Sequence, residues 1–325
     1  MTTPGGVDSV RVGAVDCGTN SIRLLVADLH AQADGTPALH EITRQMQIVR
    51  LGEGLDATGR ISAPALARTL AAAQEYAALC RDAGCESVRF VATSASRDAQ
   101  NADEFVDGVH QAFGDLDVRP EVVSGQEEAA LSFAGATGDL RAGGAPGPYL
   151  VVDIGGGSTE LVRGTTAVEA ARSVDIGCVR MTERHLHDDP PTEDQVWAAL
   201  SDIVRAVQEA GEDVDLAGVG TLVGLAGSVT TVTAHALGLP AYQRDRIHGA
   251  EVQVDQVLDA CTDLLLMTRE RRRDLPYMHD GRVDVIGAGA LVWRTVVQRV
   301  AHDAGLATVR ASETDILDGI ALSQA

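Results

Sequence analysis

Two segments far apart in the chain each place an aspartate before a turn of small residues. Residues 10–30 read VRVGAVDCGTNSIRLLVADLH, and residues 148–164 read PYLVVDIGGGSTELVRG. Aligning Asp16 with Asp153 also superimposes Gly18 on Gly155, Ser21 on Ser158 and Leu24 on Leu161. A strand-end carboxylate can hold hydrated Mg²⁺, and the backbone amides of a glycine turn can bind phosphate oxygens. One copy alone would suggest a hairpin turn, but two copies in register predict a paired phosphate site.

The small residues of both turns are therefore candidate phosphate ligands. Three consecutive glycines in the second turn permit the positive φ angles and close approach that an anion-binding nest requires. The candidates in the two turns are Gly18, Thr19, Asn20, Ser21, Gly155, Gly156, Gly157 and Ser158. Asp16 and Asp153 are candidate metal ligands, with simple turn capping as the alternative.

A third glycine turn lies in LAGSVTTVTAHAL, residues 225–237. Gly227 and Ser228 would open a helix there, and the amides at a helix N-terminus attract anions. An ordinary connection between a strand and a helix explains the same residues equally well, so both readings stay open.

The elements that would position these turns follow the same order in each half. After the strand, turn and second strand comes a third apolar stretch, around 38–50 and 167–175, and then a helical segment, 62–83 and 178–187. Ser62 is a plausible helix N-cap and Gly84 a stop signal. Later segments read as strands at 87–95, 118–125 and 217–227, and as helices at 101–113, 126–136, 228–237, 251–268, 283–303 and 314–325.

This order predicts an α/β chain of two domains that flank a central cleft, into which the two aspartate turns face. We place domain I at residues 1–125 and domain II at 126–313, with the closing helix 314–325 able to pack back on domain I. A length of 325 residues allows two domains, each with its own core.

Composition narrows the functional classes. The net charge of -21 argues against broad nucleic-acid binding, and all 26 basic residues are arginine. An anionic substrate must therefore be held by arginine, backbone amides or a metal, and a lysine-dependent P-loop is excluded. Five scattered cysteines without a CxxC pair fit neither a disulfide framework nor a zinc site. Without a secretory signal or an apolar stretch long enough for a membrane span, we expect a soluble cytoplasmic protein with no membrane contact.

The pair DCGTNSIRLL and VVDIGGGSTELV resembles the two phosphate loops of the actin, sugar-kinase and Hsp70 superfamily. Within it, the chain resembles the exopolyphosphatase and guanosine-pentaphosphate phosphohydrolase (Ppx/GppA) family along nearly its whole length, in the short form that lacks an extra helical domain. Four further segments carry this resemblance: VATSASRDAQN (91–101), EVVSGQEEAALSF (121–133), VDIGCVRMTE (174–183) and HDGRVDVIGAG (279–289). The resemblance implies two actin-like (ribonuclease H-like) domains.

The resemblance also implies roles for particular residues. By its place in SGQEEA, Glu128 would be the general base that activates the attacking water, with its neighbour Glu127 as the other candidate. Asp153 and Asp16 would anchor Mg²⁺, for which Mn²⁺ could substitute, with a monovalent cation such as K⁺ as a further option. Thr93 and Ser94 would contact phosphate. We single out Arg97, just after them, as a direct phosphate clamp, because guanidinium binds phosphate in a fork.

Four functions fit these residues to different degrees. The first is an exopolyphosphatase, and the second is removal of the terminal phosphate of guanosine pentaphosphate, which the motifs do not separate from the first. A catalytically silent regulator that binds nucleotide or polyphosphate is the third, and Glu128 argues against it. A sugar kinase would place an aspartate where SGQEEA stands. For an exopolyphosphatase, the strongly negative net charge favours short polyphosphate chains as substrates and a strong Mg²⁺ requirement. The family resemblance implies a homodimer.

Overall fold

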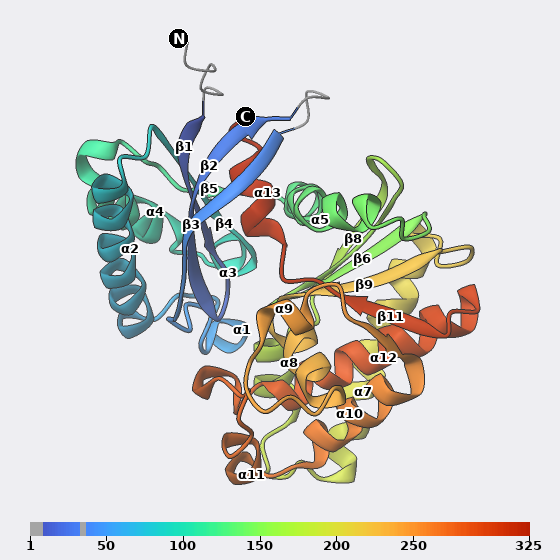
Figure 1. The fold of residues 1–325 in the computed structure, drawn as a ribbon. Helices are drawn as coiled ribbons and strands as arrows, with labels where there is room; N and C mark the ends of the chain where they lie inside the picture. The colour runs from blue at the N-terminus through green and yellow to red at the C-terminus, as the bar shows by residue number, and fades with distance from the viewer. Residues whose placement is uncertain (1–8, 33–36) are drawn as a thin grey trace.

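The computed structural model describes residues 9–32 and 37–325, which form two mixed β-sheets with helices around them (Figure 1). The first sheet has the strand order β3-β2-β1-β4-β5. Its strands are β1 (Val10–Cys17), β2 (Ser21–Ala31), β3 (Pro37–Ile48), β4 (Ser87–Ala92) and β5 (Glu121–Val122). The first three strands pair antiparallel, and β4 runs parallel to β1.

The second sheet repeats this arrangement with one extension. Its order is β10-β11-β9-β6-β7-β8, so β8-β7-β6-β9 corresponds to β3-β2-β1-β4. Its strands are β6 (Tyr149–Ile154), β7 (Thr159–Gly164), β8 (Val168–Val174), β9 (Thr221–Leu225), β10 (Glu251–Gln253) and β11 (Thr308–Ala311). β6, β7 and β8 pair antiparallel, and β9 runs parallel to β6. The predicted duplicated α/β fold is confirmed.

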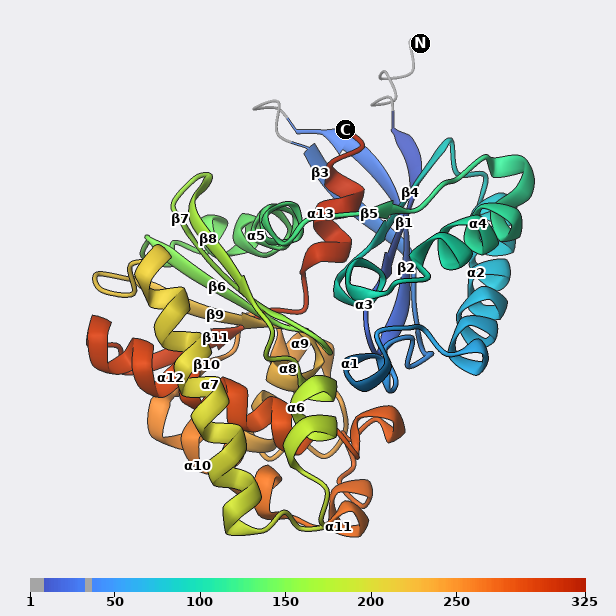
Figure 2. The same cartoon turned by 180° about the vertical axis from the view of Figure 1, so that it is seen from behind.

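Two helices of the first half, α2 (Ala63–Ala83) and α4 (Ala102–Phe113), cover the outer face of the first sheet. The other helices of this half are α1 (Leu55–Thr58), α3 (Ser94–Asp98) and α5 (Gly125–Ala142), with a 3₁₀ turn η1 (Gly114–Leu116). α2 and α4 lie side by side on the outer face (Figures 1 and 2) and bury Tyr76, Phe90 and Phe105 beneath them. Ser62 caps α2 by accepting a hydrogen bond from the Ala65 amide, as its sequence predicted.

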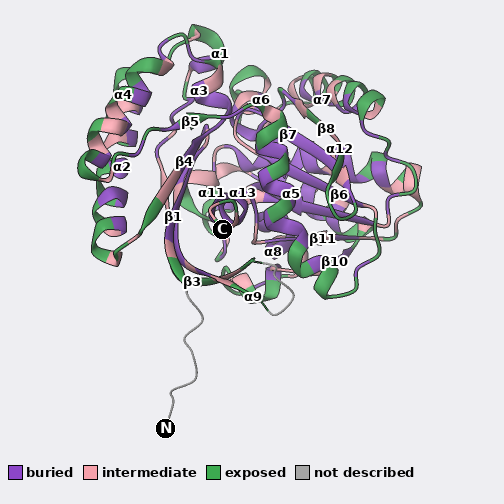
Figure 3. Cartoon of the chain, turned by 90° about the horizontal axis from the view of Figure 1, so that it is seen from above, coloured by how far each residue is buried: buried purple, intermediate pink, exposed green. Residues whose placement is uncertain are grey.

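The second half has a larger helical layer. It contains α6 (Cys178–His185), α7 (Glu193–Asp213), α8 (Ala226–Ala236), α9 (Arg244–Ile247), α10 (Val254–Leu266), α11 (Arg269–Arg273), η2 (Asp280–Arg282) and α12 (Ile286–Ala304). Figure 3 shows that buried residues gather on the sheets and on α12, whereas α2, α4 and α7 turn exposed residues outward. The fully buried Trp293 of α12 packs in this core.

Two predicted boundaries are wrong. The predicted helix at 251–268 begins only at Val254, because Glu251–Gln253 pair with β11 as a short edge strand with Val252 alone buried. The predicted strand at 118–125 shrinks to two residues, because only Glu121 and Val122 pair with β4.

The last helix, α13 (Ile316–Leu322), lies between the two sheets and runs beside α5 (Figure 2). Its Leu317 and Ile320 pack with Val12 and Leu25 of the first sheet and Leu131 of α5. Asp315 caps its start through a capping box with Asp318. The chain therefore crosses back from the second half, which places Asp315 at the boundary between the two sheets. Searched over residues 9–32 and 37–325, the helices include none that is long and apolar enough to span a membrane.

Candidate active site

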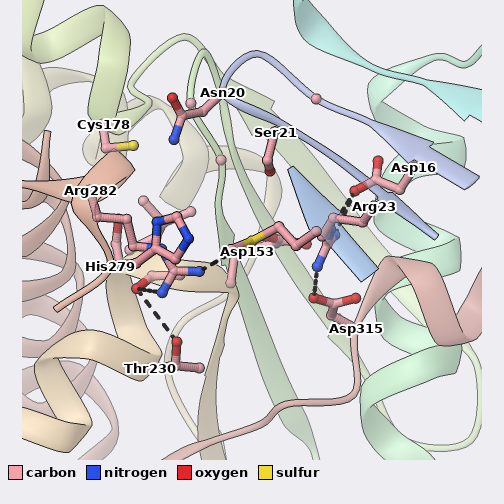
Figure 4. Close-up of a pocket in the computed structure, with 18 of the residues that line it drawn as sticks. Asp16, Asn20, Ser21, Arg23, Asp153, Cys178, Thr230, His279, Arg282 and Asp315 are labelled. Atoms are coloured by element: carbon pink, nitrogen blue, oxygen red, sulfur yellow. Dashed lines mark hydrogen bonds and ion pairs between the residues drawn. The ribbon is translucent and has the colours of Figure 1, made fainter. Parts of the chain in front are cut away.

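A cleft of about 660 Å³ lies where the two sheets meet. Most residues singled out from the sequence line it: Asp16, Gly18, Thr19, Asn20, Ser21, Thr93, Ser94, Glu128, Asp153, Gly155, Gly156, Ser158, Gly227 and Ser228. Figure 4 shows Asn20 and Ser21 of the first turn facing the same space as Asp153 and Cys178 of the second half. The two turns and the third glycine turn thus converge on one cavity.

The two aspartate turns have the same backbone hydrogen bond. The Gly18 amide donates to the Ser21 carbonyl over 3.0 Å, and the Gly155 amide donates to the Ser158 carbonyl over the same distance. Each turn therefore closes a hairpin and leaves its aspartate two residues before the glycine, at the end of the strand. This shared geometry is what the sequence repeat encodes.

Close contact between the turns explains the need for glycine in the second one. A Cβ added to Gly156 would lie 2.7 Å from Cβ of Thr19, and one added to Gly157 would lie 2.8 Å from Oγ of Ser94. Thr19 and Ser94 share a hydrogen bond of 2.9 Å. The turns from the two halves thus touch directly, so their hydroxyls and amides can act on one ligand.

Asp16 is neutralised within the protein. Nε and Nη2 of Arg23 donate to Oδ2 of Asp16 over 2.9 and 2.6 Å, and Nη1 of Arg23 pairs with Asp315 (Figure 4). Burial raises the pKa of Asp16, and the Arg23 charge opposes that effect. At Asp315 burial also raises the pKa, but the charges of Arg23 and Arg44 outweigh it and the pKa falls below its ordinary value.

Asp153 has no arginine partner of this kind. It accepts a hydrogen bond of 2.8 Å from Oγ of Ser132 on α5. Its cross-strand neighbour in the β6–β7 ladder is Glu160, which is 1% exposed. Burial, followed by the charges of Asp315 and Glu160, raises the pKa of Asp153 to about 7. The second turn therefore brings two buried acidic side chains together, and within the described residues neither of them has an ion-paired arginine.

Glu128 and Glu127 point to different environments, as successive helical residues do. Glu127 is exposed and pairs with Arg89 over 2.8 Å, whereas Glu128 is 8% exposed and lines the cleft. Burial, then the charge of Glu160, raises the pKa of Glu128 well above its usual range. The geometry therefore separates the two candidates and leaves Glu128 alone facing the cavity.

Arg97 lies beside the cleft rather than in its lining. Its Nη1 donates to the Val123 carbonyl over 2.9 Å and to Oε2 of Glu128 over 3.1 Å. These contacts hold the Glu128 carboxylate, so the structure does not support the predicted direct phosphate clamp. Gly157 likewise lies behind the cavity wall.

Sequence reasoning missed several charged residues of the site. Arg23, Arg282 and Asp315 line the cleft, as do Glu41, Arg44, Arg244 and Glu313, and Glu160 lies opposite Asp153 in the β6–β7 ladder. Glu160 lies in the buried strand β7. Because a buried glutamate is rare, its place in an apolar strand could have indicated a functional residue. Arg282 donates to the Gly227 carbonyl over 3.0 Å and to Oγ1 of Thr231 over 3.1 Å. Within the part of the chain that the structure describes, Arg282 has no carboxylate at ion-pair distance, unlike the other arginines of the cleft.

The third glycine turn is shaped around this arginine. Ala226 adopts a positive φ of 64°, and a Cβ on Gly227 would lie 2.2 Å from the Arg282 guanidinium. Gly227 is thus required for the close approach of Arg282 to the start of α8. The turn contributes both amides and a cation to the cleft.

The donor set suits a hard divalent cation with few protein ligands. Glu128, Asp153 and Glu160 are buried carboxylates. The charge of Glu160 raises the pKa values of both Glu128 and Asp153, and a cation would relieve that repulsion. Over the described residues, however, no three acidic, histidine or cysteine side chains converge on one point. Mg²⁺ commonly binds through one or two carboxylates and completes its shell with water and phosphate oxygens, which fits this arrangement.

Comparison with known proteins agrees with this geometry. The Ppx/GppA phosphatase family matches residues 25–324. The chain is 47% identical over 317 residues to exopolyphosphatase 2 of Mycobacterium tuberculosis, covering 97% of this chain and 98% of that protein. A crystal structure of an exopolyphosphatase-like protein superposes with a TM-score of 0.91 at 42% identity, covering 97% of this chain and 98% of the other. The Ppx/GppA enzyme of Aquifex aeolicus superposes at 0.77 with 28% identity, covering 97% of this chain and all of that one.

Proposed function

The chain belongs to the Ppx/GppA phosphatase family, and we propose that it hydrolyses the terminal phosphoanhydride bond of inorganic polyphosphate to release orthophosphate. The observation that carries this proposal is the position of Glu128. It is a buried carboxylate with a raised pKa that faces the same cavity as both glycine turns.

Glu128 acts as the general base in this mechanism. A carboxylate whose pKa is raised towards neutrality accepts a proton from water more effectively than an ordinary one. Arg97 holds the carboxylate in place over 3.1 Å, and its charge opposes the rise in the pKa of Glu128. A water between Glu128 and the terminal phosphorus would lose its proton to Glu128 as its oxygen attacks, and the shortened chain would leave in line.

The phosphate is held by amides, hydroxyls and one arginine. The first turn offers Thr19, Asn20 and Ser21, and the second offers Gly155, Gly156 and Ser158, all from the cavity wall. Arg282 supplies a guanidinium that no carboxylate engages within the described residues, and guanidinium binds phosphate in a fork. These donors surround the equatorial oxygens where charge increases during transfer.

We further propose that Asp153, and with it Asp16 through water, holds Mg²⁺. The cation would neutralise phosphate charge and hold the leaving group, and Mn²⁺ could replace it. Because Asp16 is already paired with Arg23, Asp153 carries the larger share of this role. A supporting K⁺, a homodimer and a cytoplasmic location remain part of the proposal.

The far end of the cleft favours short chains. Glu41 and Glu313 line it, and its two arginines are already paired: Arg44 with Asp318 over 2.6 Å and Arg244 with Glu41 over 3.0 Å. A long polyanion would find no continuous positive track there, because like charges repel across a low-dielectric wall. We therefore expect short polyphosphates to be the better substrates.

The test is phosphate release with Mg²⁺ from short-chain polyphosphate, long-chain polyphosphate, guanosine pentaphosphate and ATP. Glu128→Gln should lower turnover on polyphosphate about 10²- to 10⁴-fold, the range for losing a positioned base. Glu127→Gln is the matched control one residue away, and it should stay near wild type because Glu127 faces Arg89 outside the cleft. Equal turnover in both variants would remove Glu128 from the mechanism.

The substrate panel separates the alternatives. Release confined to guanosine pentaphosphate would replace polyphosphate as the substrate while keeping Glu128 as the base. Release from none of the four compounds, together with measurable binding of polyphosphate, would favour a catalytically silent regulator.

A further inference from the structure

The C-terminal end of α2 brings two cysteines together by its backbone geometry. Gly84 adopts φ 72°, its amide donates to the Arg81 carbonyl over 3.0 Å, and the Cys85 amide donates to the Cys80 carbonyl over 3.0 Å. In such a left-handed helix ending, the side chains five residues apart meet across the cap. Here both side chains are thiols, so the cap sets Cys80 and Cys85 side by side.

The two thiols differ in exposure. Cys80 is fully buried, and its Sγ would lie 2.9 Å from a Cβ added to Gly13 of β1. Cys85 is half-buried and borders solvent. The neighbouring Cys80 thiol lowers the pKa of Cys85; burial opposes this, and the nearby Arg11 charge lowers the pKa further. Arg11 is held there by the Ala83 carbonyl over 3.0 Å and by a forked pair with Asp28.

The remaining cysteines lack these features. Cys17, Cys178 and Cys261 are buried, and burial raises the pKa of each. Reactivity of cysteine follows the thiolate fraction and access to the reagent. Cys85 is therefore the only one of the five, all of which lie in the described part of the chain, that combines access with a stabilised thiolate.

We propose that Cys85 and Cys80 form a thiol modification site in which Cys85 reacts with a hydroperoxide and Cys80 then closes a disulfide. The Cys85 thiolate attacks the distal peroxide oxygen, the O–O bond breaks, and the alkoxide or hydroxide leaves with a proton from solvent, giving a sulfenic acid. The Cys80 sulfur then attacks the Cys85 sulfur and water departs. Two thiols are oxidised and one peroxide is reduced to an alcohol or water.

The backbone already holds the two residues close enough for this bond. With the Cys85 amide hydrogen-bonded to the Cys80 carbonyl, standard bond lengths limit the Cα separation to about 7 Å. Disulfides need roughly 4.4–6.8 Å between Cα atoms. Only side-chain rotation and a small shift of the loop after Gly84 are required.

Mass spectrometry of the purified full chain tests this site without relying on phosphate hydrolysis. After limited hydrogen peroxide, the intact mass should fall by two hydrogen atoms, and a non-reducing digest should link peptides 69–81 and 82–89, which trypsin separates at Arg81. In a separate sample kept reduced, alkylation should show Cys85 reacting about tenfold or more faster than Cys17, Cys178 and Cys261. Equal reaction of all five cysteines, or a link to any other cysteine, would overturn the proposal.

Variants separate the two roles. Cys80→Ala should leave Cys85 oxidised to the sulfenic and sulfinic acids, with the mass gaining oxygen instead of losing hydrogen. Cys85→Ser should leave Cys80 reduced at the same peroxide dose, because Cys80 is buried. Cys261→Ser, a buried site elsewhere in the core, is the control and should form the 80–85 disulfide as wild type does. If Cys80→Ala does not fold, the wild-type peptide map alone decides the outcome.

Discussion

At the first aspartate turn the carboxylate faces an arginine across the strand ladder, whereas at the second it faces a glutamate. Asp16 pairs with Arg23 in the β1–β2 register, and Asp153 pairs with Glu160 at the equivalent position of β6–β7. The two turns share backbone geometry and burial, yet one is a closed ion pair and the other is a like-charge pair. Like charges directly opposite each other in a sheet are destabilising unless something compensates them.

Because the residue opposite the aspartate differs, the two aspartate turns differ in charge. The first copy provides its own cation through Arg23, which also reaches Asp315 and so ties the closing segment to the first sheet. The second copy keeps its negative charge available, which is what a site for an external cation requires. The two turns thus share one backbone geometry, and the residue opposite the aspartate distinguishes them: Arg23 in the first and Glu160 in the second.

Removing Arg23 should have the largest effect. Arg23→Met would leave Asp16 and Asp315 buried without their partner, and breaking a buried pair from one side costs about 3–5 kcal/mol of unfolding free energy. The control lies at the other end of the same ladder, where Arg11 faces Asp28 at the surface. Arg11→Met should cost much less, because a surface ion pair contributes little to stability. Urea unfolding of both variants checks this, and equal losses would contradict the structural role of Arg23.

The second turn should make stability fall as pH rises. The folded pKa of Asp153, about 7, lies above its ordinary value, so the folded state binds the proton more tightly. Protonation of Asp153 contributes fully to the free energy of unfolding below pH about 4, and this contribution is lost as pH rises through 7. Between pH 5 and pH 8 the free energy of unfolding should fall by about 2–3 kcal/mol for this reason. Asp153→Asn should reduce this slope in unfolding experiments with a chelator present.

Two comparisons sharpen that result. Asp16→Asn should change the slope less, because Arg23 opposes the effect of burial on Asp16. Adding Mg²⁺ at pH 8 should raise the stability of wild type more than that of Asp153→Asn. Identical pH profiles for wild type and Asp153→Asn would refute the assignment of charge to the second turn.

The Mg²⁺ dependence of activity should depend more on Asp153 than on Asp16. This prediction rests on the proposed function. Asp153→Asn should raise the Mg²⁺ concentration for half-maximal phosphate release by about 10- to 100-fold, the range seen for weakened metal sites. Asp16→Asn should raise it less, since its carboxylate is engaged by Arg23. The measurement is a Mg²⁺ titration at saturating polyphosphate. An unchanged titration for Asp153→Asn would take Asp153 out of the metal site.

Much of the fold, and both aspartate turns, could be predicted from local sequence patterns. The repeated strand, aspartate and glycine turn consists of consecutive residues, and the antiparallel pairing of the first two strands of each half follows from it. Even the Asp16–Arg23 pair could have been inferred, because a four-residue turn between Cys17 and Ile22 sets 16 opposite 23. The same counting would have placed Glu160 opposite Asp153.

Contacts between distant residues could not be predicted in this way. Asp315 reaches Arg23 only because the chain returns between the sheets at α13, almost three hundred residues later. Arg97 looked like a phosphate ligand because nothing local shows that Glu128 lies within its reach. Helix α7 received no assignment from the sequence, although Ile203, Val207 and Ala210 are buried at helical spacing.

The smallest predicted effect tests the hydroxyl that supports Asp153. Ser132 lies one helical turn after Glu128 on α5 and donates to Oδ2 of Asp153 over 2.8 Å. Because a hydrogen bond to a charged group favours its ionised form, Ser132→Ala should raise the pKa of Asp153 and cost about 1.5 kcal/mol of unfolding free energy at pH 8. Ser201→Ala, at an exposed helical serine on α7, is the control and should be nearly neutral. A purely packing role for Ser132 predicts the same loss at pH 5 and pH 8, whereas support of an ionised Asp153 predicts a loss that grows as pH rises through 7.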